Sequence, residues 1–186
     1  MNKITWVLAA VVAAIIGWLI YTYNKLVTYR LRASEAISDI DVQLKRRFDL
    51  IPNLVEAVKG YMQHERQVLE NVTTARAKVA SGGGDPIERA DRENMLSNTL
   101  KTLFAVSENY PDLKANANFL DLQRELADTE NKIQASRRFY NTTVRDYNTA
   151  LGVFPTNIIA GFFKFSPEKF FEVEGAEERE PVKVKF

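Results

Sequence analysis

The chain has 186 residues, a length that suits one domain and a membrane anchor, because domains typically hold about 100 to 150 residues. Its 25 Lys and Arg nearly balance its 24 Asp and Glu, so bulk charge predicts neither a nucleic acid nor an anionic surface as a partner. The sequence contains no cysteine, which excludes a disulfide framework, a thiolate nucleophile and a cysteine metal site.

The first expected element is a membrane-spanning helix over residues 4–23. This stretch is almost wholly apolar, contains no ionisable Asp, Glu, Lys, Arg or His, and as a helix reaches about 30 Å, one hydrocarbon core. Trp6 lies near one end and Trp18, Tyr21 and Tyr23 near the other, where aromatic rings favour the headgroup level. The alternative is a cleaved signal peptide, but its apolar region usually has only about 7 to 15 residues before a small-residue cleavage site. We therefore expect the helix to stay in the membrane.

The charges that flank this span predict its orientation. Lys3 and the amino terminus precede the span, whereas Lys25, Arg30 and Arg32 follow it closely. The positive-inside rule then places the residues after the span in the cytoplasm.

A repeat of small residues lies within the span. Ala9, Ala13 and Gly17 recur every four residues, a spacing that lets transmembrane helices approach closely. Alanine is common in membrane spans, so a stripe that simply faces lipid is the alternative. The repeat makes these three residues candidates for self-association.

A long amphipathic helix is expected next. Apolar residues recur in steps of three and four from Ala33 to Val79, as on a helix that buries one face. Pro52 interrupts this run and costs about 3 kcal/mol inside a helix. The apolar stripe keeps its phase across Pro52, so we expect a kink there rather than a reversal. A kink would leave the C-terminal phenylalanines far from the bilayer, and a reversal would return them to the lipid surface.

Two strong breaks divide the rest of the chain. Three consecutive glycines at residues 82–84 predict a turn, and Asp85-Pro86 then supplies an N-cap acceptor and a proline suited to the first helical position. Tyr110-Pro111-Asp112 ends that helix. A third helix opens near Asn118, and its apolar stripe runs to Leu151.

A phenylalanine-rich segment follows Pro155. Its aromatic side chains are either a core that caps the helical bundle or an apolar contact surface for another subunit, a partner or the lipid interface. The residues in question are Phe162, Phe163, Phe165, Phe170 and Phe171. The charged tail at residues 172–186 is expected to be flexible.

The sequence offers no catalytic or metal-binding pattern. His64 is the only histidine, and Val68 occupies the position where a zinc protease helix needs its second histidine. The carboxylates of Asp39, Asp41 and Asp49 have neighbouring Lys and Arg partners, which is typical of a solvated helix face. We therefore predict no catalytic residue, no metal and no cofactor.

A polar repeat lies on the last long helix. Tyr140-Asn141 recurs seven residues later as Tyr147-Asn148, on the same helix face. Buried amides need partners and so tend to set helix register, which predicts a structural role. A polar groove that grips a peptide is the alternative.

Several segments together carry a family resemblance. They are Tyr23-Asn24-Lys25-Leu26-Val27, residues 39–47, residues 49–55, Lys59-Gly60-Tyr61, His64-Glu65, residues 110–116 and Phe154-Pro155. These segments resemble the LemA family of bacterial proteins, over almost the whole chain from Tyr23 to Phe171. The resemblance implies an inner-membrane protein with a helical cytoplasmic domain and no established catalytic activity. Genes of the family often neighbour a membrane zinc metalloprotease, which suggests that protease as a partner.

These observations predict an all-α protein: a transmembrane helix, an antiparallel bundle of long helices and a short Phe-rich segment. We expect an anchor at residues 1–24, a LemA-like bundle at residues 25–171 and a tail at residues 172–186. The predicted function is a non-enzymatic, self-associating scaffold or adaptor in contact with the lipid bilayer of the bacterial inner membrane. A partner that presents substrates to a membrane metalloprotease, or restrains it, is the alternative.

Overall fold

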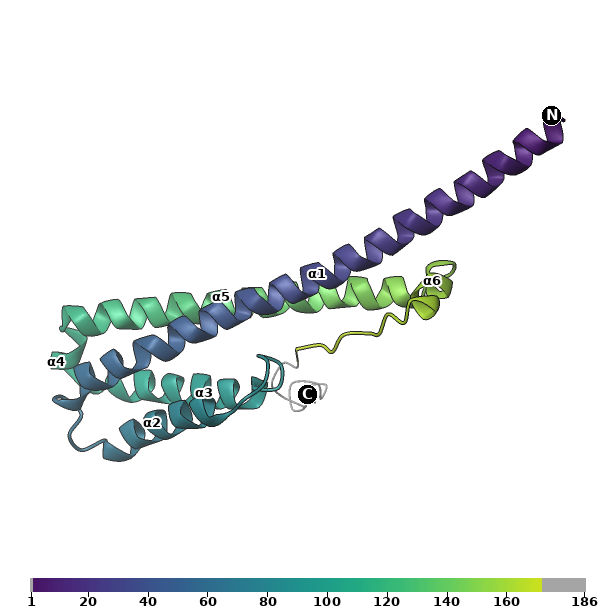
Figure 1. The fold of residues 1–186 in the computed structure, drawn as a ribbon. Coiled ribbons are helices and arrows are strands. Elements are labelled where there is room, and N and C mark those ends of the chain that lie inside the picture. The colour runs from purple at the N-terminus through teal and green to yellow at the C-terminus, as the bar shows by residue number, and fades with distance from the viewer. Residues whose placement is uncertain (1, 172–186) are drawn as a thin grey trace, which may run out of the picture. The chain divides into compact units, whose positions relative to one another are not determined.

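The computed structural model describes residues 2–171, so the tail predicted at residues 172–186 lies outside the described residues. No strand occurs in the described part, and the expected all-α fold is confirmed. In chain order the helices are α1 (Lys3–Lys59), α2 (Arg66–Ser81), α3 (Ala90–Ser107), α4 (Pro111–Lys114), α5 (Ala117–Gly152) and α6 (Thr156–Phe162) (Figure 1).

The described chain separates into two compact units, and both α1 and α5 contribute to each of them. Residues up to Ile37 and residues 138–170 form the first, here called the anchor unit. Residues 38–137 with Phe171 form the second, here called the bundle unit. The boundary that we expect at residue 24 separates the span alone from the rest and stays a prediction.

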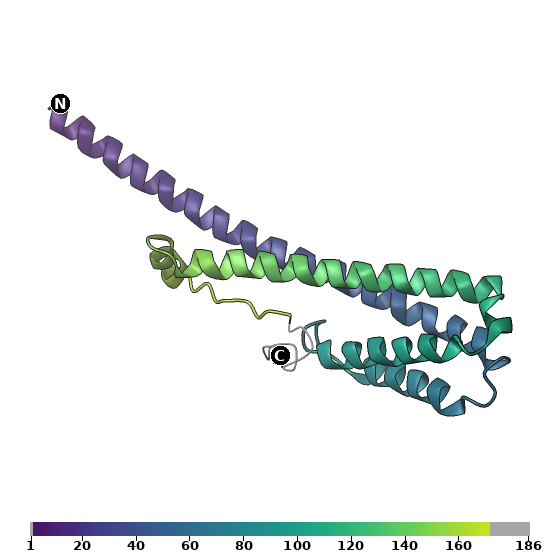
Figure 2. The same ribbon diagram turned by 180° about the vertical axis from the view of Figure 1, so that it is seen from behind.

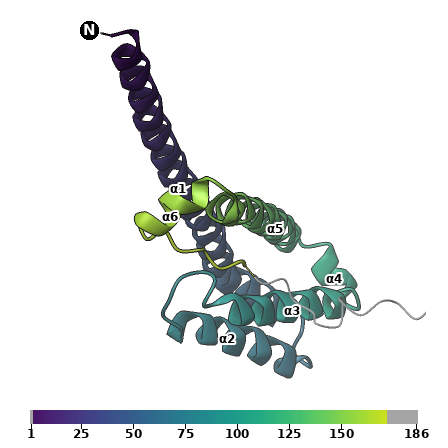
Figure 3. The ribbon, with the colours of Figure 1, turned by 90° about the vertical axis from the view of Figure 1, so that its right-hand side faces the viewer.

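The bundle unit is an up-and-down arrangement of four helical segments. The later part of α1, then α2, α3 and the first part of α5 lie side by side, and α4 connects α3 to α5 (Figures 1 and 3). Each fully buried aliphatic or aromatic side chain contributes about 1.5 to 3 kcal/mol. The core consists of Ile51, Leu54, Val58, Met62, Val72, Ala75, Val79, Leu96, Leu100, Leu103, Leu113, Phe119 and Leu126.

The expected continuous helix from Ala33 to Val79 is wrong. α1 ends at Lys59, and the chain reverses over residues 60–65 before α2 begins. The reversal starts where the backbone N–H groups of Tyr61 and Met62 both donate to the Val58 carbonyl, at 3.0 and 2.9 Å. The apolar phase persists across the turn because both helices face the same core, so the sequence pattern alone does not reveal it.

The helix passes through Pro52 without reversal, as predicted. Pro52 has no N–H, so the carbonyl of Phe48, four residues earlier, loses its helical donor. Arg76 of α2 replaces that donor: its Nε donates to the Phe48 carbonyl at 3.2 Å, and its guanidinium lies 3.8 Å from the centre of the Phe48 ring. A side chain from the neighbouring helix thus compensates for the proline.

The two later breaks lie close to where the sequence places them. Gly84 has a φ of +101°, and the Asp85 carboxylate accepts from the N–H groups of Ile87 and Glu88 at 2.9 and 3.0 Å. This capped segment forms turns, and regular α3 begins only at Ala90. α5 begins at Ala117, next to the expected Asn118.

The anchor unit contains the first part of α1, the end of α5, and α6. α1 is the one helix in the described chain that is long and apolar enough to cross a membrane. Its apolar stretch lies near the N-terminus, and none of that stretch is buried. One cluster of its core lies where α6 packs on α1. Leu26, Ile159 and Ala160 are buried in it, with Ala150, Leu151 and Phe165 packed against them.

Candidate interaction surface

The candidate surface lies where α6 meets the end of the predicted span. The Tyr23 ring of α1 lies 4.7 Å from the ring of Phe163 and 5.8 Å from that of Phe165, measured between centroids. The expectation that a kink at Pro52 leaves the phenylalanines far from the bilayer is therefore wrong. The unpredicted reversal after α1 adds one pass to the chain, so α5 ends near Leu26, just after the span, and α6 lies against the span's last turns (Figure 2).

The phenylalanines of this segment divide between core and surface. Phe165 is half-buried, as a cap on the unit requires, but Phe162 is 80% exposed and Phe163 is 51% exposed. Phe170 is also exposed. Phe171 is buried in the bundle unit, where the Arg137 guanidinium lies 4.4 Å from its ring centre, so its assignment to a contact surface is revised.

An apolar groove runs between α1 and α6 within the anchor unit. It has a volume of about 460 Å³, and almost no polar atoms line it. The lining residues are Leu19, Ile20, Tyr23, Ile158, Ile159, Phe162 and Phe163. Because large contiguous apolar surfaces on a protein mark contacts with partners or lipid, this groove is the strongest candidate site.

The small residues of the span are also open to contact. Ala9, Ala13 and Gly17 are all exposed, and a Cβ placed on Gly17 would meet nothing within 4 Å. A second helix could therefore approach closely along this face. Their role in self-association stays a prediction.

The Tyr–Asn repeat of α5 holds a segment of the protein's own chain. The Tyr140 hydroxyl donates to the Lys169 carbonyl at 2.7 Å. The Asn148 amide pairs with the backbone of Glu168 in both directions, donating at 2.9 Å and accepting at 3.0 Å. Asn141 is half-buried. Tyr147 is buried, and this burial raises the pKa of its hydroxyl above the ordinary value. Tyr140 and Asn148 thus hold the segment after α6, and the role predicted for the repeat as a whole stays a prediction.

A buried charged cluster in the bundle unit was not predicted. The Arg47 side chain is 1% exposed, and its guanidinium donates to the carboxylates of Glu93 and Glu130 at 2.6 and 2.7 Å and to the Ser97 hydroxyl. Arg47 falls three residues after Leu44 and four before Ile51, so its spacing on the apolar stripe is the signal that identifies it. Residue type suggested a solvated arginine instead.

The cluster also sets the ionisation of Glu130. Burial acts to raise the pKa of this carboxyl, but the Arg47 charge and hydrogen bonds from Gln134, Ser97 and Arg47 lower it more. The pKa therefore lies below its ordinary value, and the carboxylate stays charged. Its arginine is already occupied by two carboxylates, so the cluster is suited to holding helices in register.

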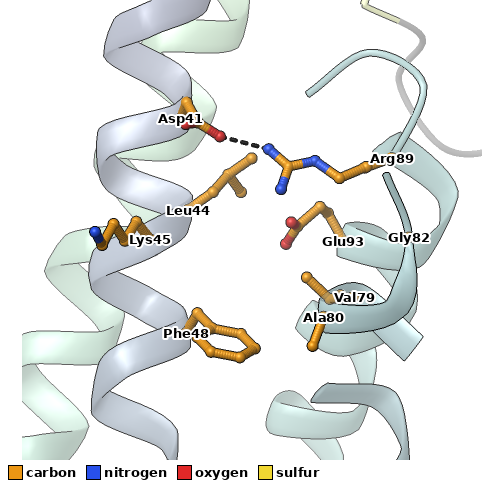
Figure 4. Close-up of a pocket in the computed structure, with 9 residues that line it drawn as sticks. All are labelled: Asp41, Leu44, Lys45, Phe48, Val79, Ala80, Gly82, Arg89 and Glu93. Atoms are coloured by element: carbon orange, nitrogen blue, oxygen red, sulfur yellow. Dashed lines mark hydrogen bonds and ion pairs between the residues drawn. The ribbon is translucent and has the colours of Figure 1, made fainter. Parts of the chain in front are cut away.

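A small pocket of about 230 Å³ lies beside this cluster (Figure 4). Three of the four charged residues that line it are paired: Asp41 bonds Arg89, and Glu93 bonds Arg47. The remaining wall is largely apolar, with Leu44 and Phe48 of α1 facing the end of α2. This pocket contains no nucleophile beside a base, so it is a weaker candidate than the groove.

The residues considered for metal or acid–base chemistry stay apart. His64 is exposed in the connection between α1 and α2. Over residues 2–171, no group of three or more His, Asp or Glu side chains is arranged to hold a metal ion.

Comparison with known proteins agrees with the sequence segments described above. The sequence model described as LemA family matches residues 36–186. A protein named LemA from Metamycoplasma hominis is 27% identical over 137 residues, which cover 74% of this chain and 63% of that protein. The chain thus spans less than two thirds of that relative's length.

Two further relatives are named as magnetosome proteins. Magnetosome protein MamQ 2 of Paramagnetospirillum magneticum is 25% identical over 190 aligned positions, covering 89% of this chain and 70% of that protein. Magnetosome protein MamQ of Magnetospirillum gryphiswaldense is 24% identical over 188 positions, covering 88% and 69%. With the candidate span, these relatives identify a membrane-associated protein.

Proposed function

The chain belongs to the LemA family, and on that premise we propose that it is a non-enzymatic, self-associating scaffold or adaptor anchored in the bacterial inner membrane. The observation that carries the proposal is the contrast between exposed and buried groups. Apolar side chains of the span and of α6 point outward, whereas the buried charges around Arg47 are paired. A surface of this kind makes contacts, and paired charges hold the helices together.

Self-association through the small residues of the span is the first part to test. The chain contains no cysteine, so Ala13→Cys and Ile15→Cys each create a single thiol in the full-length protein. If the stripe is the interface, oxidation in native membranes gives a disulfide-linked dimer with Ala13→Cys and much less with Ile15→Cys. Equal yields at both positions, or no dimer at either, contradict this interface.

The proposed orientation can be tested with the same background. Asn2→Cys precedes the span and Met95→Cys lies on an exposed position of α3. A cytoplasmic bundle unit predicts that a membrane-impermeant maleimide labels Asn2→Cys in spheroplasts and labels Met95→Cys only after lysis. The reverse pattern places the bundle unit outside the cytoplasm.

A membrane metalloprotease as partner rests on the family resemblance alone, and the relatives' names do not mention one. Affinity capture of the full-length chain tests it. Capture of a protease by the native chain and its loss with Phe162→Ser, Phe163→Ser and Phe165→Ser together would favour this alternative over a general scaffold.

A further inference from the structure

A second hollow adjoins the apolar groove in the anchor unit. Its lining is polar and apolar in similar measure, and it shares Tyr23 and Phe163 with the groove. The two hollows therefore form one continuous surface with an apolar end and a polar end. The second hollow is lined by Tyr23, Val27, Arg30, Leu31, Ser34, Phe163, Lys164 and Phe165.

The polar end carries two cations and one carboxylate. The Arg30 side chain is 63% exposed, and its Nε lies 3.9 Å from the nearest Glu168 oxygen, a separation at which exposed ion pairs are weak. Lys164 makes no ion pair within residues 2–171. Its backbone φ of +57° is uncommon for lysine and lies in the turn that follows α6. The polar end is therefore net positive, although the whole chain is nearly neutral.

The order of these two ends along α1 matches the depth profile of a lipid leaflet. Leu19, Ile20 and Tyr23 occupy the last turns of the predicted span, at the level of acyl chains and glycerol. Arg30 follows Tyr23 by seven residues, which is about 10 Å along a helix. Headgroup regions add about 5 to 7.5 Å to each side of the hydrocarbon core, so the Arg30 backbone lies just outside this layer. The long side chains of Arg30 and Lys164 can reach back to the phosphate level.

We propose that this continuous surface binds an anionic phospholipid of the surrounding leaflet. One acyl chain occupies the apolar groove beside Phe162, and the phosphate contacts Arg30 and Lys164. The groove is continuous with the lipid-facing side of the span, so a lipid enters it without leaving the bilayer. α6 then acts as a second membrane contact. The inference rests on the membrane span and not on the scaffold role or on self-association.

The polar end is tested by lipid retention. Full-length protein in mild detergent is mixed with equal amounts of phosphatidylglycerol and phosphatidylcholine, and bound lipids are counted by native mass spectrometry. The native chain should retain several-fold more phosphatidylglycerol, and Arg30→Gln with Lys164→Gln should reduce that preference to near equality. Arg32→Gln is the matched control, since Arg32 is an exposed cation two residues away that does not line the hollow. A native chain without preference, or a double variant that keeps it, overturns the proposal.

The apolar end is tested by fluorescence quenching. With Trp6→Phe and Trp18→Phe as background, Phe162→Trp places the chain's one tryptophan at the groove. The protein is reconstituted in vesicles of phosphatidylglycerol and phosphatidylcholine with brominated acyl chains, which quench only tryptophans in contact with lipid tails.

Phe139→Trp in the same background is the control. Phe139 is also an exposed phenylalanine of the anchor unit, but it does not line the groove. It lies on α5, 13 residues before that helix ends at Gly152. Quenching several-fold stronger for Phe162→Trp than for Phe139→Trp supports the proposal. Equal quenching at the two positions overturns the proposal. A second protein copy that covers the groove would give this result, because it would keep lipid tails away from Phe162→Trp. Disulfide trapping through Ala13→Cys is independent of either result, so this inference and self-association can fail separately.

Discussion

The anchor unit and the bundle unit use the same residue types in opposite ways. Phe119 of the bundle unit is 1% exposed, whereas Phe162 of the anchor unit is 80% exposed. The Arg47 side chain is enclosed by two carboxylates, whereas the Arg30 side chain is 63% exposed. The bundle unit covers most of its apolar side chains with its own helices, whereas the anchor unit leaves many of its apolar side chains exposed. Residue type alone therefore does not decide whether a phenylalanine or an arginine of this chain is buried or exposed.

Loss of the buried arginine should have the largest effect on the bundle unit. Arg47→Met leaves the Glu93 carboxylate, whose side chain is 2% exposed, without its cation. Breaking a buried ion pair in this way costs about 3 to 5 kcal/mol of unfolding free energy. Urea unfolding of the full-length chain in detergent, followed by circular dichroism, measures it.

Two variants bracket this result. Arg46→Met removes an exposed arginine that pairs with Glu125 and should cost far less. Arg47→Met combined with Glu93→Leu removes the two fully buried charges, leaves the partly exposed Glu130 carboxylate, and should restore part of the stability. If Arg47→Met costs no more than Arg46→Met, the cluster does not hold the bundle unit together.

The next effect is a loss of stability in acid. Because the pKa of Glu130 is lowered in the folded chain, its contribution is present above the ordinary value of 4.5 and disappears as pH falls through the lower folded value. The native chain should therefore lose more stability than Glu130→Gln between about pH 5.5 and about pH 3. Urea midpoints at several pH values check this. Parallel pH profiles would show that Glu130 does not contribute.

A smaller effect should follow from removing the side chain that compensates for the helical proline. Arg76→Met leaves the Phe48 carbonyl without a donor from protein and should cost about 1 to 2 kcal/mol. In a Pro52→Ala background, the alanine N–H can bond that carbonyl, so the same change should cost less. A double-mutant cycle measures the difference, and purely additive costs would mean that the two residues are not coupled.

The smallest predicted effect concerns the segment that α5 holds in the anchor unit. Tyr140→Phe removes the hydroxyl that donates to Lys169 and should cost about 0.5 to 1.5 kcal/mol. Tyr147→Phe is the matched control, because the Tyr147 hydroxyl is buried without a hydrogen-bond partner in the described part of the chain. Thermal unfolding should rank Tyr140→Phe below both the native chain and Tyr147→Phe. Equal losses would show that the hydroxyl contact is not what holds the segment.

Features that depend on a few neighbouring residues could be predicted from the sequence. An apolar run of about 20 residues predicts a span, because length and composition alone decide whether a helix suits a bilayer. Gly84 and Asp85 predict a turn for similarly local reasons, a permissive backbone and a short carboxylate that caps free N–H groups. The resemblance to the LemA family, carried by contiguous segments, also follows from the sequence.

The reversal after α1 was beyond such reasoning. An apolar stripe reports which face of a helix is buried, and it keeps the same phase when the next helix turns back onto the same core. Gly60 and the polar residues after it can be recognised as a turn only when the structure shows that Val58 and Met62 are both buried. The number of passes, and with it the position of α6 beside Tyr23, therefore depended on that one connection.

Residue chemistry fixed the membrane anchor and the helical character of this chain, while packing decided which side chains face what. Arg47 reads as a surface residue until α3 and α5 enclose it, and the sequence leaves Phe162 open between core and contact surface until α6 is seen to leave it uncovered. The reason is that propensity and hydrophobic spacing act over neighbouring residues, whereas burial depends on segments that are tens of residues apart. The neighbours of Arg47 come from α3 and α5, 46 and 83 positions further along the chain.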